Sequence, residues 1–266
     1  MFKTRLLSGI VLVALSIFLI ITGKEILLFS TMAISLVGMF ELYRIFKIHD
    51  NILGFVGYAS AIAYYLNLKL HFANDVALIA MATMIFIMFV YVFTYPKYKA
   101  NQITTCFFGI FYVAVMLSYI YQIRNLTNGV YIAFLIFLCS WGCDTCAYCA
   151  GKLFGKHKMS PKLSPKKSVE GAIGGVLGTV ILTVVYLSIF RRNMKIDVKE
   201  IMILAIVSAI AAFVSMVGDL TASAIKRNYE IKDYGKLIPG HGGILDRFDS
   251  MIITAPIIYY LAYYTL

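Results

Sequence analysis

The chain is built from long apolar runs that are separated by short polar segments. Most of these runs approach the roughly 20 apolar residues that an α-helix needs to cross a bilayer. The run over 53–68, with its many Gly, Ala and Tyr residues, is the weakest. The pattern predicts an all-α, polytopic integral membrane protein with about nine transmembrane helices, at residues 6–23, 26–43, 53–68, 76–95, 103–121, 129–150, 171–190, 201–220 and 250–266.

Composition supports a membrane location for the whole chain. Its 266 residues are 61% hydrophobic and only 14% charged, with a mean hydropathy of +0.84, which is far from the averages of soluble domains. Lys3 and Arg5 give the first run a basic start, but the run is longer than the apolar core of a signal peptide and continues into Lys24 without a small-x-small cleavage site. We therefore expect a retained helix there.

The distribution of basic residues predicts the orientation. With the N-terminus inside, the inner segments hold all but seven of the 24 Lys and Arg residues, which favours an N-terminus inside and a C-terminus outside. The net charge of +11 then gathers on the cytoplasmic face of a multi-pass cell-membrane protein. Anionic lipid headgroups and nucleotide phosphates are available partners there, and nucleic acid is not an expected one. The seven exceptions are Lys24, Lys69, Arg124, Arg191, Arg192, Lys195 and Lys199.

Residues that carry chemistry are unevenly spread along what we interpret as one membrane domain, 1–266. Residues 1–125 have few polar groups and are expected to form scaffold helices. Residues 126–266 form the expected catalytic half. Its polar loops, 151–170 and 221–249, lie on the same, cytoplasmic side by the charge argument.

Four cysteines in the catalytic half suggest a metal cluster at first sight. Cys139, Cys143, Cys146 and Cys149 fall on roughly one helical face. Four ligands on one continuous helix cannot surround an ion tetrahedrally, so small packing residues in a reducing environment are favoured.

Four glycines at the start of the seventh span form two overlapping GxxxG pairs, which allow helices to approach closely. They are Gly171, Gly174, Gly175 and Gly178. Helix packing is favoured for them. Backbone approach to a phosphate and a homodimer face are the alternatives.

Four carboxylates mark the candidate chemistry. Asp144 lies inside an apolar span, roughly 9 Å of helix from its inner end, where an ionisable group is unfavourable enough to indicate function. Asp219 closes the eighth span, while Asp246 and Asp249 open the ninth. Because the sixth and eighth spans run inward and the ninth runs outward, all four are expected at one level of the inner face. Carboxylate oxygens beside Lys and Arg suit a magnesium-bound phosphate.

These acids also have structural alternatives. Asp249 is equally typical of a helix N-cap or a first-turn acid. For Asp144 and Asp219 the alternative is a salt bridge to Lys226 or Arg227.

The segment 239–243, with the sequence PGHGG, combines a chain reversal with glycines that let backbone amides approach an anion. It stands between the pairs Lys232-Asp233 and Asp246-Arg247, so we interpret it as a phosphate cradle. For His241, phosphate binding or stabilisation of the turn is favoured over proton donation, since metal-bound pyrophosphate already leaves readily.

The other polar loop carries Lys166 and Lys167 within a Ser-Pro-Lys-rich segment, 160–171. A DNA-binding repeat is one interpretation of this segment, but its position between two spans argues against it. Contacts to lipid or nucleotide phosphates and a simple positive-inside determinant explain the two lysines equally well.

Together the polar residues form a long pattern with fixed spacing. It comprises Ser223-x-Ile225-Lys226-Arg227, Lys232-Asp233-x-Gly235 and Ile238-Pro239-x-His241-Gly242-Gly243-Ile244-x-Asp246-Arg247-Phe248-Asp249. Upstream, Asp144-Thr145-x-Ala147-Tyr148 and Ser164-Pro165-Lys166-Lys167-Ser168-x-Glu170-Gly171 extend it. The pattern resembles that of the phosphatidate cytidylyltransferases, also called CDP-diacylglycerol synthases. It covers 141–250 by motif and the rest by hydropathy, and Val169 departs from the aromatic residue of many members.

The resemblance implies a magnesium-dependent nucleotidyltransferase of phospholipid biosynthesis. The phosphate of phosphatidic acid would attack the α-phosphorus of CTP and give CDP-diacylglycerol and pyrophosphate. One or two Mg²⁺ ions are expected, with a monovalent cation as a further candidate. CTP, phosphatidic acid and membrane lipid are the expected partners, and a homodimer stays open. A site at the cytoplasmic membrane surface fits a lipid substrate and a soluble triphosphate.

We expect Asp144, Asp219 and Asp246 to hold the metal and, with Lys226 and Arg227, to carry catalysis. No general base is required, because a lipid phosphate is largely ionised near neutral pH. Ser223 shares a helical face with Asp219 if that helix continues. The expected substrate-binding residues are Lys166, Lys167, Ser223, Lys232, Asp233, His241, Gly242, Gly243, Arg247 and Asp249.

Two other functions stay open at this point. A CTP-dependent kinase of a prenol or other lipid would use the same cation-rich site but move the γ-phosphoryl group. An ion-coupled transporter would bind its ion at Asp144 and Asp219, although the charges cluster on one face rather than at the midplane.

Overall fold

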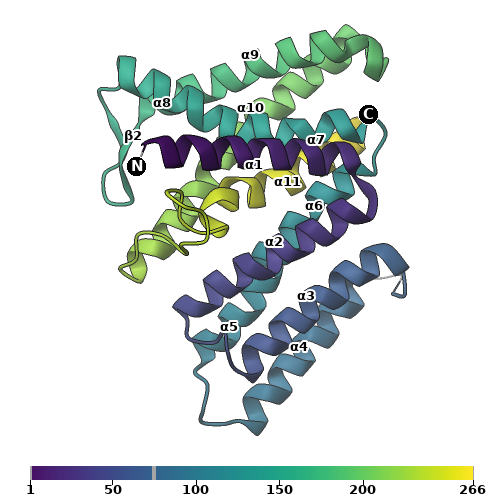
Figure 1. Ribbon diagram of the computed structural model, residues 1–266, viewed down its shortest axis with the longest axis vertical. Helices are drawn as coiled ribbons and strands as arrows, with labels where there is room; N and C mark the ends of the chain where they lie inside the picture. Colours follow the sequence, from purple (N-terminus) through teal and green to yellow (C-terminus); the bar gives the residue numbers. More distant parts are fainter. Residues whose placement is uncertain (1, 74–75, 266) are drawn as a thin grey trace. The chain divides into compact units, whose positions relative to one another are not determined.

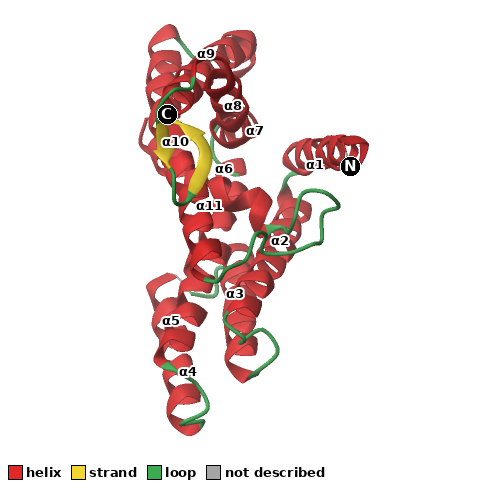
Figure 2. Cartoon of the chain, turned by 90° about the vertical axis from the view of Figure 1, so that its left-hand side faces the viewer, coloured by secondary structure: helices red, strands yellow, loops and turns green. Residues whose placement is uncertain are grey.

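The computed structural model describes residues 2–73 and 76–265. Met1, Asn74, Asp75 and Leu266 lie outside the described residues, and Leu266 is the last residue of the expected ninth span. Within the described ranges the chain is helical almost throughout, with one two-stranded sheet (Figure 2). The mostly helical class that the apolar runs predict is confirmed.

The described helices correspond one to one with the expected spans. Two of them contain a π-helical segment: α5 (Ala100–Gly109), η1 (Ile110–Val115) and α6 (Met116–Arg124) follow without a break, as do α7 (Gly129–Phe137), η2 (Leu138–Gly142) and α8 (Cys143–Phe154). The others are α1 (Phe2–Thr22), α2 (Lys24–Ile45), α3 (Ile52–Leu70), α4 (Val76–Phe93), α9 (Val169–Met194), α10 (Val198–Asn228) and α11 (Leu245–Thr265).

Six of the described helices are long and apolar enough to cross a membrane, namely α2, α4, α5 through α6, α7 through α8, α9 and α10. Helix α1 adds a shorter apolar stretch, Leu6–Thr22. The chain is therefore a multi-pass helical membrane protein, as predicted. The largest differences are that α10 continues to Asn228 instead of residue 220 and that α11 begins at Leu245 instead of residue 250. Hydropathy detects only the apolar part of a helix, so it does not predict these polar extensions.

The chain divides into two compact units. Unit 1 consists of Met1–Ser118 and Asp233–Arg247, and unit 2 of Tyr119–Lys232 and Phe248–Leu266. The first boundary lies near residue 125, where the expected scaffold half ends. The segment Asp233–Arg247 nevertheless groups with the N-terminal helices.

In unit 1, α2 packs against α3 and η1, and α3 packs against α4 (Figure 1). Tyr43 on α2 is fully buried and its hydroxyl donates to Cys106 O at 2.6 Å. A Cβ atom at Gly57 would lie 2.6 Å from this hydroxyl, and one at Gly109 would lie 2.4 Å from the ring. The ring of Tyr43 therefore fills the space that two glycines leave, which fixes α2 against its neighbours.

In unit 2, α9 packs against both α8 and α10. A Cβ atom at Gly174 would lie 2.2 Å from Ala150 Cβ, and one at Gly178 would lie 2.6 Å from Cys146 Sγ. The glycines of α9 thus face the small residues of α8, and the packing role expected for the glycines is confirmed. Cys143 and Cys146 pack against these glycines, whereas Cys149 is exposed. A homodimer would need a face other than these glycines, because α8 covers them.

A short hairpin joins α8 to α9. Its strands β1 (Lys158–Ser160) and β2 (Ser164–Ser168) pair antiparallel, with Lys158 opposite Ser168. The Ser168 hydroxyl caps α9 by accepting the N–H of Gly171 at 3.1 Å. Glu170 accepts from the backbone N–H groups of Lys156 and His157 at 3.0 and 3.2 Å. These bonds fix the hairpin at the start of α9.

Candidate active site

Three predicted site residues lie along one face of α10 in unit 2. Because α10 continues to Asn228, Asp219, Ser223 and Lys226 occupy positions i, i+4 and i+7 of the same helix. All three are half-buried, whereas Arg227 beside them is exposed. The helix thus continues past Asp219, and Ser223 shares a face with Asp219 as expected in that case. The basic end of α10 also suits the negative end of the helix dipole.

The two lysines of the hairpin differ in the structure. Lys167 Nζ on β2 donates to Asp219 Oδ2, and both side chains are about one quarter exposed, at 25% and 24%. Successive residues of a strand point to opposite faces, so Lys166 points away from this contact, and it is exposed. The sequence offered Lys226 or Arg227 as salt-bridge partners for Asp219. The ion pair formed is with Lys167.

In unit 2, one of the four predicted carboxylates, Asp249, lies within electrostatic reach of two others, Asp219 and Asp144. Asp249 on α11 is only 7% exposed. The charges of Asp219, Lys226 and Asp144 all act on its carboxyl group. Asp144 itself is exposed in the first turn of α8, directly after the π-helical segment η2. π-Helical turns in long helices are often found at functional sites.

The donor chemistry of these carboxylates fits Mg²⁺. Among the residues that the structure describes, no group of three or more His, Cys, Asp and Glu side chains is arranged to hold a metal ion. Mg²⁺ in phosphoryl-transfer sites usually takes one or two carboxylates, with water and substrate phosphates completing its shell. Asp144, Asp219 and Asp249 supply hard oxygen donors of this kind.

In unit 1 the segment before α11 folds around Asp246, which is 5% exposed. Asp246 Oδ2 accepts from Tyr234 N at 2.7 Å and from Gly243 N at 2.9 Å. The Gly243 amide, which was expected to face a phosphate, therefore binds the protein's own carboxylate. A phosphate cradle at this segment stays a prediction.

The predicted chain reversal is present at 238–241. His241 N donates to Ile238 O at 2.9 Å, and Gly240 has φ +78°, which is the pattern of a type II turn with Pro239 at its second position. Gly242 also has a positive φ of +88°. Both glycines thus take backbone conformations that other residues rarely adopt.

His241 is held by a residue that the sequence did not indicate. The Ser8 hydroxyl donates to Pro239 O at 3.1 Å and lies 2.7 Å from His241 Nδ1. Because the single hydroxyl proton goes to the carbonyl, Nδ1 is the donor in the second bond. This contact supports the turn-stabilising alternative for His241.

Two charged residues of α2 also escaped the sequence reasoning. Glu41 accepts from Ile244 N at 3.1 Å and from Leu245 N at 2.8 Å. Arg44 Nη2 donates to Tyr234 O at 2.6 Å. Glu41 carries the same signal that identified Asp144, namely an ionisable residue within an apolar helix.

The remaining predicted residues lie nearer to solvent. Lys232 and Asp233 are exposed in the segment that follows α10, and Arg247 is half-buried in the first turn of α11.

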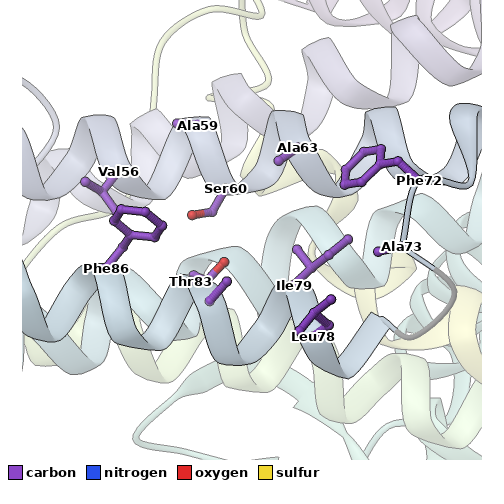
Figure 3. Close-up of a pocket in the computed structure, with 11 residues that line it drawn as sticks. Val56, Ala59, Ser60, Ala63, Phe72, Ala73, Leu78, Ile79, Thr83 and Phe86 are labelled. Atoms are coloured by element: carbon purple, nitrogen blue, oxygen red, sulfur yellow. The ribbon is translucent and has the colours of Figure 1, made fainter.

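A cavity in unit 1 lies between α3 and α4 and has a volume of about 470 Å³ (Figure 3). Among the described residues that line it, Ser60 and Thr83 have polar side chains and none is charged. Phe72 and Phe86 are drawn at its two ends (Figure 3). A triphosphate needs cationic or backbone N–H partners, so the apolar side chains described here do not favour a nucleotide site.

Comparison with known proteins identifies what the chain is similar to. A family model described as "Cytidylyltransferase family" matches residues 3–265. A phosphatidate cytidylyltransferase of Bacillus subtilis (strain 168) is 32% identical over 266 residues, with 97% of each chain covered. A phosphatidate cytidylyltransferase of Staphylococcus aureus (strain COL) is 31% identical over 265 residues, with 96% of this chain and 97% of the relative covered.

Proposed function

This chain belongs to the cytidylyltransferase family, and we propose how its residues share the reaction. The reaction is that of a phosphatidate cytidylyltransferase, a nucleotidyltransferase of phospholipid biosynthesis. A phosphate oxygen of phosphatidic acid attacks the α-phosphorus of CTP, and the bond from that phosphorus to the oxygen bridging to the β-phosphate breaks. CDP-diacylglycerol and pyrophosphate result.

Both substrates are anionic, so they repel each other unless cations surround them. We assign Lys226 and Arg227, at the end of α10, to the phosphates of the two substrates. Lys167 reaches the same face of α10 through Asp219 and is assigned to a phosphate as well. Positioning and charge neutralisation are the main sources of catalysis in such transfers.

We assign Asp144 and Asp219 to one or two Mg²⁺ ions. Asp249 is assigned to the same ions, because its carboxyl group lies within electrostatic reach of Asp144 and Asp219. When bound, the metal neutralises phosphate charge and polarises the α-phosphoryl group. Asp246 keeps its proposed metal role in addition to its bonds to Tyr234 and Gly243. A monovalent cation is a further proposed occupant of these acids.

The observation that carries this assignment is that Asp249 lies within electrostatic reach of Asp144 and of Asp219, and that Asp219 forms an ion pair with Lys167. The carboxylates of Asp219 and Asp144 both repel that of Asp249, and an arrangement of this kind is stable when cations balance it. Lys167 and Lys226 offset part of this negative charge, and we propose that a divalent ion offsets the rest.

The placement is tested with Asp219→Asn and a matched variant, Asp197→Asn. Both residues lie on or next to α10, but Asp197 caps its opposite end by accepting from Glu200 N at 2.8 Å. We expect Asp219→Asn to lower kcat by about 100-fold or more, since a metal ligand is lost, and Asp197→Asn to change it by less than about threefold, because Asn also caps helices. Label from α-labelled CTP should enter the lipid product, and label from γ-labelled CTP should enter pyrophosphate.

Equal activity of the two variants would contradict the assignment of Asp219. Label from the γ position in the lipid would instead indicate a lipid kinase. Thermal unfolding adds a measurement of binding. CTP with Mg²⁺ should raise the Tm more than ATP with Mg²⁺, or than CTP or Mg²⁺ alone, because ligands stabilise the folded state that binds them.

We further propose that the N-terminus and the active site face the cytoplasm. The excess of basic residues on one set of loops supports this orientation, and CTP is available on that side.

A further inference from the structure

Helix α11 begins at a position where its own sequence provides no cap. The residue before Leu245 is Ile244, whose side chain has no hydrogen-bond acceptor. The first N–H groups of a helix have no partner within the helix, and Ile is among the poorest N-cap residues. Water or another part of the chain has to accept these N–H groups.

Glu41 of α2 supplies that cap from about 200 residues away. Its two carboxylate oxygens accept from Ile244 N at 3.1 Å and from Leu245 N at 2.8 Å, and the residue is only 4% exposed. A carboxylate at this end of a helix also interacts favourably with the helix dipole. Both partners belong to unit 1.

Two glycines of the sequence pattern make room for this carboxylate. A Cβ atom at Gly235 would lie 2.0 Å from Glu41 Oε1, and one at Gly243 would lie 2.3 Å from the same atom. Neither position tolerates a side chain while Glu41 keeps its place. The glycine requirement at 235 and 243 is therefore explained by a residue outside the pattern.

Arg44, one helical turn further along α2, contacts the same segment. Its Nη2 atom donates to Tyr234 O at 2.6 Å, while Tyr234 N donates to Asp246 Oδ2 at 2.7 Å. Asp246 in turn accepts from Gly243 N at 2.9 Å. The backbone at 234–235 and 243–245 is thus held from α2 on one side and by Asp246 on the other.

We propose that Glu41 and Arg44 are positioning residues for the cytidylyl transfer, and that they fix the segment 234–245 and, through it, the orientation of Asp246. This inference rests on the proposed role of Asp246. It assigns a function to the end of α2, a helix that the sequence places in the scaffold. Neither residue is required to touch a substrate.

The test compares Glu41→Gln with Glu25→Gln on the full-length protein in detergent. Glu25 lies on the first turn of the same helix and forms an exposed ion pair with Lys69 at 2.8 Å, so its variant removes the same charge from α2 without touching the segment. Glutamine has nearly the shape of glutamate but presents an NH₂ group to one backbone N–H. Amide hydrogen exchange of the peptide covering 243–246, kcat, the Mg²⁺ concentration for half-maximal activity and the Tm are measured.

For Glu41→Gln we expect exchange of this peptide to be faster by about tenfold, because a backbone N–H loses its acceptor. We also expect kcat to fall by about tenfold or more and the Mg²⁺ requirement to rise. Glu25→Gln should leave the exchange rate, kcat and the Mg²⁺ requirement unchanged. Faster exchange with unchanged kcat and Mg²⁺ requirement would overturn the positioning role but leave the reaction itself intact. If Glu41→Gln lowers both the Tm and the fraction of active protein but leaves the Mg²⁺ requirement unchanged, the role of Glu41 is purely structural. That result would overturn the proposal as well.

Arg44→Lys decides the matter if Glu41→Gln does not fold. Lysine keeps the charge but lacks the guanidinium geometry that reaches Tyr234 O. A raised Mg²⁺ requirement in folded Arg44→Lys supports the proposal, and wild-type behaviour contradicts it. Exchange is measured without substrate, so it reports on the segment even if the assignment of Asp246 to the metal fails.

Discussion

At the scale of single residues, two neighbouring side chains of the same type have different surroundings because successive residues of a strand point to opposite faces. Lys166 and Lys167 are indistinguishable in sequence, and both were expected to bind substrate phosphates. On β2 they point to opposite faces, and Lys167 contacts Asp219 while Lys166 is exposed. The pair therefore provides a matched comparison within one strand.

We expect Lys167→Ala to lower kcat/KM by about tenfold or more, equivalent to roughly 1.4 kcal/mol, since a charge-assisted partner of Asp219 and of phosphate is lost. Lys166→Ala should lower it by less than about threefold. Steady-state kinetics with short-chain phosphatidic acid in detergent measures both. A larger loss of kcat/KM in Lys166→Ala than in Lys167→Ala would mean that the exposed face of the strand contacts the substrates.

At the scale of elements, the close packing of α8 on α9 fixes the helix that carries Asp144. Gly174 of α9 faces Ala150 of α8 so closely that a Cβ atom would lie 2.2 Å from Ala150 Cβ. The neighbouring Ile173 is 57% exposed and points away from this interface. Small residues on both helices let the backbones approach, as in other membrane helix pairs.

Gly174→Ala should therefore destabilise the protein by about 1–3 kcal/mol, because the added methyl group overpacks the interface. Ile173→Ala should have a much smaller effect. The double variant Gly174→Ala with Ala150→Gly should recover most of the loss, since it moves the methyl group from one helix to the other. Thermal unfolding in detergent compares the four proteins. If the added Ala150→Gly substitution does not restore the Tm, the strain does not lie at the contact between residues 174 and 150.

At the scale of the whole molecule, orientation in the membrane is the largest property that stays a prediction. It is tested in cells with the exposed Cys149 replaced by Ala and one new cysteine introduced in each of two loops. Lys162→Cys, in the loop of the hairpin, should react with a membrane-impermeant maleimide only after permeabilisation. Lys199→Cys, at the start of α10, should react in intact cells. Because the positive-inside rule places these loops on opposite faces, the reverse result would invert the orientation.

Several features of the fold and the site were predictable because they depend on local sequence alone. Apolar runs of bilayer length identified the helices, and the PGHGG segment indicated the turn that Gly240 and Gly242 form with positive φ. The motif pattern around Asp219 and Asp246 indicated the family to which the chain belongs. The ends of α10 and α11 were missed, since polar residues extend both helices beyond their apolar parts.

By itself, the sequence determined the class of protein, its membrane helices, its family and the residues that carry charge in that family's pattern. Tertiary structure decided which of those charges meet. It paired Asp219 with Lys167, a partner that the sequence did not indicate, and it brought Glu41 to the start of α11. The physical reason is that hydropathy and motif spacing act along the chain, whereas an ion pair or a cap forms between residues that only folding brings together.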